Sequence, residues 1–422
     1  MFRVFILVLV VEMAMACLAA HYHPEPIADE DEHLLDLERF ARLGWTTEAH
    51  QGRRAYSGSL GYYVAAKLYR GWPSLAAVRW YSLVTMSLGL AGAGWLARRC
   101  TGSWFPGIML LLAPHTTLCM AAFKTEGGAL LMVVAGLLCL DSGLKSGRGK
   151  AAGGLFLGAG VFLAAAVLHR QTWVIVPVGL IGVGLLSHWR LHLAGVRTAC
   201  LMAGGASLVI AAMVGFVTGA SVPGTFSHDP SQSKLAMGNW LLSYLAFLPW
   251  YGAGLWAASL APGDDRRHRL KLFGCSAVVA SGLVAWVVSQ DLSHFWLGHG
   301  PINSVLGIFK WSWLKAACLL LFSTLGLYLL LGLASRVLRD ASSSAAGTFV
   351  LGCLVSLGCV LAVVRLPTTW YERYMLTPLF CLAATLPGTL ARPWHRSLQC
   401  GLFLCLQLGV NYRNELLDWM FP

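Results

Sequence analysis

The chain has 422 residues, of which 57% are hydrophobic and 12% are charged. Because soluble globular proteins carry roughly 25% charged residues, this composition excludes an ordinary soluble domain, and apolar segments of about 20 residues indicate an all-α polytopic membrane protein. The formal net charge of +12 is spread over short connectors, which argues against a nucleic-acid-binding domain, and the cysteines show no CxxC pair or metal-ligand spacing.

The first predicted element covers residues 2–20, "FRVFILVLVVEMAMACLAA". The stretch fits a first transmembrane helix with Arg3 on the cytosolic side, and it also fits a signal peptide with a cleavage site near Ala20. We favour the helix, because many apolar segments follow it. With either interpretation the next segment lies on the non-cytosolic side of the membrane.

The following loop, at about residues 21–74, is acidic, unlike the rest of the chain. It holds eight of the 19 Asp and Glu residues, and four of them are consecutive, Asp29–Glu32. From Asp31 the stretch "DEHLLDLERFARLGW" predicts an amphipathic helix that stops at Gly44. The predicted apolar stripe of this helix consists of Leu34, Leu35, Leu37, Phe40 and Leu43. Such a helix fits the membrane interface and would hold its N-terminal acids near the bilayer surface.

The apolar segments together predict about 13 membrane spans. They cover approximately residues 2–20, 75–97, 104–122, 127–141, 152–168, 172–189, 198–218, 239–261, 271–289, 313–335, 346–364, 375–391 and 397–412. With the N-terminus in the cytosol, basic residues such as Arg98, Arg99, Lys145 and Lys150 fall in the inner connectors, as the positive-inside rule requires.

Unusual polar residues collect in the predicted outer connectors. These connectors contain "FKTEGG" (Phe123–Gly128), "HRQT" (His169–Thr172), "TGASVPGTFSHDPSQSK" (Thr218–Lys234), "SQDLSHFWLGHGPINS" (Ser289–Ser304) and "RLPTTWYERY" (Arg365–Tyr374). Since ionisable groups beside membrane spans are energetically costly, their concentration on one side of the membrane indicates a functional site there.

Three roles are open for the acids Asp29–Glu32. They fit a solvated helix start, where the helix dipole favours carboxylates. They also fit a metal site, together with His21, His23 and His33. In the third interpretation one carboxylate is a catalytic base that deprotonates an acceptor hydroxyl.

The other polar connectors also allow two interpretations each. Arg170 fits a side chain that reaches to the bilayer surface, or a phosphate clamp, because a guanidinium matches phosphate geometry. Arg373 beside Glu372 fits a local ion pair or phosphate binding. The remaining candidates fit interfacial anchors or turn residues in one interpretation and donor-binding residues in the other: Lys124, Glu126, His228, His294 and His299.

The order of these motifs resembles that of the GT-C-type glycosyltransferases. Within that class it most resembles the dolichyl-phosphate-glucose alpha-1,2-glucosyltransferase family, which adds the last glucose to the lipid-linked oligosaccharide. The segments that carry the resemblance are "EDEHLLDLERF", "AAFKTEGGALLMV", "HRQTWVIVP", "FVTGASVPGTFSHDPS", "HFWLGHGPINSVLGIFKW" and "YERYMLTPL". Two segments depart from the family pattern: "YSGS" replaces a proline pair after the first-loop helix, and Gly298–Ser304 lacks an Asn-Arg-His-Tyr run.

The resemblance implies a GT-C-like fold in a single domain, residues 1–422, with its catalytic loop at about residues 21–74. It implies an inverting transfer of a hexose, with glucose as the expected sugar, from a dolichyl- or polyprenyl-phosphate donor to a lipid-linked glycan on the non-cytosolic face. Asp31 is the implied base, with Asp29 and Glu32 as alternates. The implied donor-binding and substrate-binding residues are Arg170, Gln171, Arg373, His294, His299, Lys124, Glu126 and His228.

We expect no metal ion and no cofactor, since a lipid-phosphate leaving group does not require a metal in principle. The expected partners are the lipid-phosphate sugar, the lipid-linked acceptor and membrane lipid, without nucleic acid. The expected compartment is the endoplasmic reticulum membrane, with a bacterial inner membrane as the alternative. Alternative functions are a mannosyltransferase of the same architecture acting on lipid anchors or other glycans, a catalytically inactive scaffold, and a non-enzymatic lipid or sugar transporter, which would be expected to show internal repeats.

Overall fold

The computed structural model describes residues 1–27, 30–51, 58–146, 149–187, 194–218, 266–289, 312–339 and 393–413, with short pieces at 241–242, 244–246, 248–249, 349 and 351–355. All regular elements in these ranges are helices, as the predicted all-α class requires. The predicted site residues that lie outside these ranges are Asp29, His228, His294, His299 and Arg373. The predicted spans 239–261, 346–364 and 375–391 lie wholly or mostly outside them as well.

Six helices in the described ranges are long and apolar enough to cross a membrane. They are α1 (Phe2–Tyr22), α8 (Glu126–Lys145), α9 (Lys150–His169), α11 (Ala194–Thr218), α14 (Arg266–Ser289) and α16 (Ser312–Arg339). Each coincides with a predicted span, so the prediction of a multi-pass membrane protein is confirmed. The predicted total of about 13 spans includes segments beyond the described ranges.

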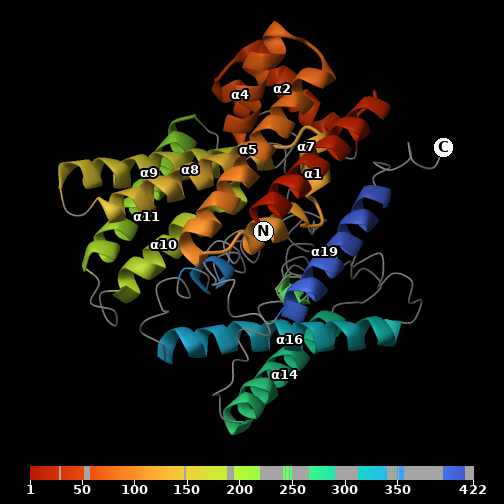
Figure 1. Ribbon diagram of the computed structural model, residues 1–422, viewed down its shortest axis with the longest axis vertical. Helices are drawn as coiled ribbons and strands as arrows, with labels where there is room; N and C mark the ends of the chain where they lie inside the picture. The colour runs from red at the N-terminus through yellow and green to blue at the C-terminus, as the bar shows by residue number, and fades with distance from the viewer. Residues whose placement is uncertain are drawn as a thin grey trace.

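Further helices complete the bundle drawn in Figure 1. α5 (Leu75–Thr101) packs against α8, and α10 (Ile175–Leu186) follows a short 3-10 helix, η1 (Gln171–Val174). α19 (Pro393–Arg413) lies beside α1, since Gln407 Nε2 donates a hydrogen bond to Glu12 Oε2 at 2.9 Å. α14 and α16 pack on each other, far from the helices of the first loop (Figure 1).

The prediction of one continuous helix over residues 104–122 is wrong. The structure has two short helices instead, α6 (Phe105–Leu111) and α7 (Thr116–Ala121). Pro114 lies in the break; it has no backbone N–H, and its ring disfavours a helical conformation of the residue before it. The break places Thr117 of α7 against α1, where its hydroxyl donates to Glu12 Oε2 at 2.6 Å.

The amphipathic helix expected in the first loop is confirmed as α2 (Glu30–Leu43). It ends at the predicted glycine: Gly44 has a φ of 70°, which residues with a side chain rarely adopt, and its N–H donates to Phe40 O at 2.9 Å. Leu37 and Phe40 are fully buried, but Leu35 is 45% exposed. The predicted place of Leu35 on the apolar stripe is therefore wrong, because it lies about 200° around the helix from Leu37.

The buried face of α2 packs on α4 (Ser59–Gly71), and short α3 (Thr47–Gln51) connects the two. The first-loop core consists of Leu37, Phe40, Ala49, Tyr62, Ala65, Ala66, Val78 and Phe123. Val78 belongs to α5 and Phe123 to the turn before α8, so this core attaches the first loop to the bundle. Figure 1 shows α2 and α4 together at one end of the molecule.

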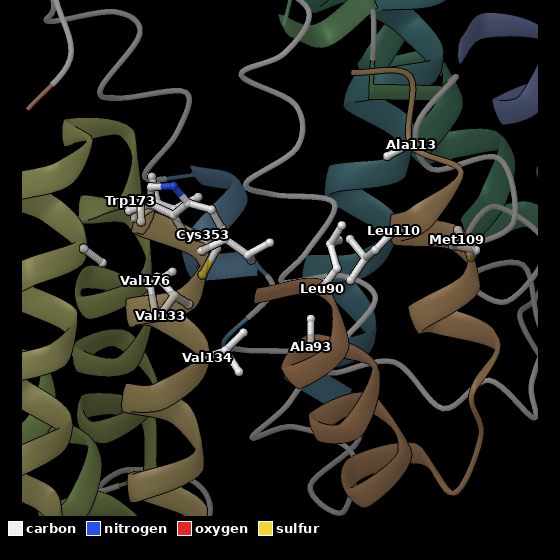
Figure 2. Close-up of a cluster of buried hydrophobic side chains, with 14 of the residues drawn as sticks. Leu90, Ala93, Met109, Leu110, Ala113, Val133, Val134, Trp173, Val176 and Cys353 are labelled. Atoms are coloured by element: carbon white, nitrogen blue, oxygen red, sulfur yellow. The ribbon is translucent and has the colours of Figure 1, made fainter. Parts of the chain in front are cut away.

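The main core lies between the bundle helices. In Figure 2, Leu90 of α5 faces Leu110 of α6, and Val133 of α8 lies close to Val176 of α10. Trp173 of η1 joins this cluster and is 1% exposed. Because Trp173 follows "HRQT" directly, its burial fixes the turn that carries those polar residues.

The inner ends of α5 and α8 also meet, at the side predicted to face the cytosol. Arg99 Nη2 lies 2.6 Å from Asp141 Oδ2, and Lys145 Nζ lies 3.1 Å from the same oxygen. Arg99 and Lys145, two of the basic residues expected in inner connectors, therefore share one end of the bundle. The turn before α8 and the end of α9, both expected on the outer side, lie at the opposite end.

Candidate active site

Five segments that the sequence places on the outer side meet at one end of the bundle. They are the end of α1, the start of α2, the start of α5, the turn before α8, and the junction between α9 and η1. Their polar contacts form one connected group, which we call the outer cluster. It consists of Glu30, Arg79, Ser82, Phe123, Lys124, Thr125, Glu126 and Arg170.

Glu30 is the fully buried acid of this cluster, with 0% of its side chain exposed. Its Oε2 lies 2.7 Å from Arg79 Nη2 and accepts the Ile27 N–H at 2.9 Å. Its Oε1 accepts the Phe123 N–H at 2.5 Å. Both carboxylate oxygens are therefore used in holding α2 to α5 and to the turn before α8, which makes Glu30 a structural acid.

Asp31 and Glu32 follow Glu30 in the first turn of α2, and both are exposed. Asp31 is thus an accessible carboxylate fixed directly beside a buried anchor. His33 points the other way, into the first-loop core, where its Nδ1 lies 2.5 Å from Tyr62 Oη. That position separates His33 from the exposed acids with which it was considered as a metal ligand.

The turn before α8 is buried. Lys124 is 0% exposed and Glu126 is 4% exposed, so the interpretation of these residues as interfacial anchors is wrong. The Lys124 N–H donates to Ser82 Oγ at 3.0 Å, and the Ser82 hydroxyl donates back to Lys124 O at 3.2 Å. These bonds fix the turn to α5.

Arg170 is a buried cation at the junction of α9 and η1. Its side chain is 7% exposed, and its Nη2 lies 3.2 Å from Glu126 Oε1, while its Nη1 donates to Thr125 Oγ1 at 3.5 Å. A side chain that reaches out to the bilayer surface is therefore excluded. Gln171, the next residue, is half-buried at the start of η1.

The start of α4 packs on the same junction. The Gly58 N–H donates to His169 O at 2.9 Å, and a Cβ added to Gly58 would lie 2.0 Å from Leu168 O. A Cβ added to Gly61 would lie 2.7 Å from Thr125 Cγ2. The glycine of "YSGS", where the chain departs from the family pattern, is thus required for this close approach.

Several members of this region were not singled out from the sequence. Arg79 lies in a predicted span and was treated as part of it; the available signal was a lone arginine near the outer end of an apolar segment, a type of residue that is often functional. Tyr81 and His169 also meet there, with 3.4 Å between Tyr81 Oη and His169 Nε2. Nothing local in the sequence links these two positions.

An apolar groove lies beside the outer cluster, between the end of α1 and the start of α5. Its volume is about 500 Å³, and it is partly open. Its lining includes Ala16, Ala20, Leu75, Ala76, Leu83 and Met120. Arg79 also lines it, so the groove borders the residue that holds Glu30.

No protein-family model and no curated protein matches the chain. Among solved structures, ArnT from Cupriavidus metallidurans in the apo state is 14% identical, with a TM-score of 0.39, over 94% of this chain and 77% of that one. The Archaeoglobus fulgidus oligosaccharyltransferase is 10% identical, with a TM-score of 0.35, over 91% of this chain and 55% of that one. Arabinosyltransferase EmbB from Mycobacterium smegmatis is 13% identical, with a TM-score of 0.34, over 96% of this chain and 41% of that one. Similarities of this size carry no argument about this chain.

Proposed function

We propose that the chain is a GT-C-type glycosyltransferase that moves a sugar from a lipid-phosphate donor to an acceptor hydroxyl on the outer face of the membrane. One observation supports this most strongly: an accessible acid, Asp31, and a buried arginine, Arg170, belong to the same end of the bundle. They are connected through Glu30, the turn Phe123–Glu126 and their hydrogen bonds. An acid and a fixed cation are the groups that an inverting transfer from a phosphate donor needs.

In the proposed reaction Asp31 is the general base. Its carboxylate takes the proton of the acceptor hydroxyl while that oxygen forms a bond to the anomeric carbon of the donor sugar. The bond between the anomeric carbon and the phosphate oxygen breaks, and the lipid phosphate leaves with the bonding electrons. Attack from the face opposite the leaving group inverts the anomeric configuration, through an oxocarbenium-like transition state.

Arg170 is the proposed stabiliser of the departing phosphate. Its pairing with Glu126 and its contact with Thr125 hold the guanidinium in a fixed orientation. A cation that is already oriented stabilises developing negative charge without reorganising during the reaction. Buried Lys124, in the turn before α8, adds another positive side chain to the outer cluster.

The other donor-binding and substrate-binding residues remain part of this proposal as the resemblance implies them. They are Gln171, Arg373, His294, His299 and His228, with Asp29 and Glu32 as alternate bases. Of these only Glu32 and Gln171 lie in the described part of the chain. Glu32 is exposed like Asp31, so it is the described alternate that has access to an acceptor.

The apolar groove is the proposed site for the lipid chain of the donor. Its lining includes small apolar side chains of α1 and α5, such as Ala20 and Ala76, and larger apolar ones such as Leu83 and Trp80. Burying isoprenoid carbons there is favourable by about 0.8 kcal/mol for each CH₂-sized group. Because the groove borders Arg79, a lipid chain bound there would lie next to the outer cluster.

For the finer assignment we propose glucose as the sugar, dolichyl or polyprenyl phosphate as the carrier, and a lipid-linked glycan as the acceptor. The endoplasmic reticulum membrane is the proposed location. The test is to incubate the purified protein with radiolabelled dolichyl-phosphate glucose and dolichyl-phosphate mannose, and to measure label in lipid-linked glycans. Transfer of glucose alone supports the full proposal, transfer of mannose alone replaces the sugar, and transfer of neither sugar contradicts both proposed hexose donors, whereas failure with every lipid-phosphate sugar contradicts the proposed function.

A further inference from the structure

Arg79 of α5 makes an unusually complete set of contacts for one side chain. Its Nε lies 3.2 Å from Glu30 Oε1, and its Nη2 donates to Glu30 Oε2 at 2.7 Å and to Glu25 O at 2.6 Å. Its Nη1 donates to Ala20 O at 3.2 Å and also to His23 O. Every nitrogen of the guanidinium therefore has an acceptor, and the side chain is only 6% exposed.

These contacts come from three parts of the chain. The carbonyls of Ala20, His23 and Glu25 belong to the end of α1 and the segment after it, and Glu30 begins α2. Glu30 in turn accepts the N–H of Phe123, in the turn that leads to Glu126. One arginine thus joins the exit of α1, the start of α2 and, through Glu30, the turn before α8.

The consequence for Asp31 is geometric. Asp31 follows Glu30 in the first turn of α2, so its backbone cannot shift without disturbing a carboxylate that is held by Arg79, Ile27 and Phe123. Asp31 itself is exposed and has no comparable anchor of its own among the bonds described above. Its place relative to the Arg170 junction therefore depends on the Arg79–Glu30 pair.

We infer that Arg79 and Glu30 are positioning residues for the proposed base, which they hold at a fixed distance from the phosphate-binding side of the site. This inference rests on the proposed function. Arg79 has no role in binding the donor phosphate, because its donors are already used by Glu30 and by backbone carbonyls. A misplacement of the base by about 1 Å lowers a rate by about 100-fold, so kcat is the quantity that this pair controls.

The test compares Arg79→Lys and Glu30→Gln with the wild-type protein. Lysine keeps the positive charge, but its ammonium is a single point charge on a flexible stem. It therefore cannot bind the Glu30 carboxylate and the backbone carbonyls at the end of α1 at the same time. Arg98→Lys is the matched control: Arg98 lies on the same helix, at its opposite end, where it is exposed and donates to Gly102 O.

Two measurements are made on correctly folded, monodisperse protein. The first is transfer kinetics, where we expect kcat to fall by about 10- to 100-fold in Arg79→Lys and Glu30→Gln while KM for the lipid donor changes by less than about 3-fold. The second is hydrogen–deuterium exchange, which does not depend on activity. In both variants we expect faster exchange at the backbone amides of Ile27 and Phe123, whose N–H groups donate to the Glu30 carboxylate. We expect unchanged exchange in the first-loop core around Tyr62.

Three outcomes would overturn the inference in distinguishable ways. Wild-type kcat in Arg79→Lys, with an active wild-type protein, contradicts the positioning role alone. A lowered kcat without faster exchange at Ile27 and Phe123 also contradicts the positioning role. The Arg79–Glu30 pair would then not be the contact that holds the start of α2. A wild-type protein that transfers no sugar from any lipid-phosphate donor overturns the proposed function, and this inference with it.

Discussion

Nη2 of Arg170, at the end of α9, lies 3.2 Å from Oε1 of Glu126, at the start of α8, and both side chains are buried. This pair connects two outer segments that the sequence marks separately as "FKTEGG" and "HRQT". A buried ion pair orients its members, but it also makes each of them costly to remove. Mutations in the pair therefore have to be interpreted for stability and for activity separately.

Arg170→Ala is expected to destabilise the protein by about 3–5 kcal/mol, because Glu126 is left as a buried charge without its cation. Glu126→Gln introduced together with Arg170→Ala removes that charge. We expect the double variant to recover most of the lost thermal stability, measured by unfolding in detergent, while sugar transfer stays lost. Recovery of transfer in the double variant would show that Arg170 has no part in donor binding.

Ala76→Trp is expected to fill the groove between α1 and α5, which Ala76 lines. KM for a long-chain lipid donor should rise by about 10-fold or more, since several buried CH₂ groups lose their site. A donor with a short, water-soluble chain should show a much smaller change. Leu88→Trp is the control, because Leu88 lies on the same helix, is 54% exposed and does not line the groove; equal effects of the two variants would contradict the assignment of the groove.

Glu12→Leu is expected to weaken the packing of α1 against α7 and α19. Thr117 and Gln407 both donate to Glu12 Oε2, and inside a membrane each such bond contributes about 1–2 kcal/mol at most. Glu12→Gln keeps an oxygen acceptor and should be closer to wild type in melting temperature. The double variant Glu12→Leu, Gln407→Leu should lose less free energy of unfolding than the two single variants together, because the two residues share one interaction. Strictly additive losses would contradict the interaction between Glu12 and Gln407.

Gly58→Ala is expected to lower stability by about 1–3 kcal/mol, because its Cβ would lie 2.0 Å from the Leu168 carbonyl oxygen. Gly153→Ala on α9 is the opposite case: a Cβ there meets nothing within 4 Å, and alanine in a helix is favoured over glycine by roughly 0.5–1 kcal/mol. The two melting temperatures should therefore move in opposite directions. Similar shifts would mean that α4 does not pack on the Arg170 junction as described.

Much of the fold follows from local sequence patterns. The long apolar segments predict α1, α8, α9 and α11, and Gly44 ends α2 as predicted, because both features depend on neighbouring residues. The break between α6 and α7 has a visible cause in Pro114, but the apolar composition on both sides suggested one helix. The exposure of Leu35 differs from the prediction because Leu35 lies about 200° around α2 from the buried Leu37, a relation that helical geometry already contains.

Less of the candidate site could be predicted from local sequence patterns. "FKTEGG" and "HRQT" do come together, and the start of α2 joins them. The other three outer connectors lie almost wholly outside the described residues. The contacts that join them are long-range, as between Arg79 and Glu30 or between Arg170 and Glu126. Four consecutive acids look equivalent in a sequence, and only the structure distinguishes buried Glu30 from exposed Asp31. That distinction depends on Arg79, which no local pattern connects with the acidic loop.

The most direct measurement is sugar transfer by purified Asp31→Asn protein, with Glu48→Gln as an exposed-acid control from α3. Both variants should be produced and should melt like the wild type, since both side chains are exposed. We predict that Asp31→Asn lowers transfer from a lipid-phosphate sugar by about 100-fold or more, since general-base catalysis contributes roughly 100- to 10,000-fold, while Glu48→Gln keeps wild-type transfer. Near wild-type transfer by Asp31→Asn would contradict the assignment of Asp31 as the base.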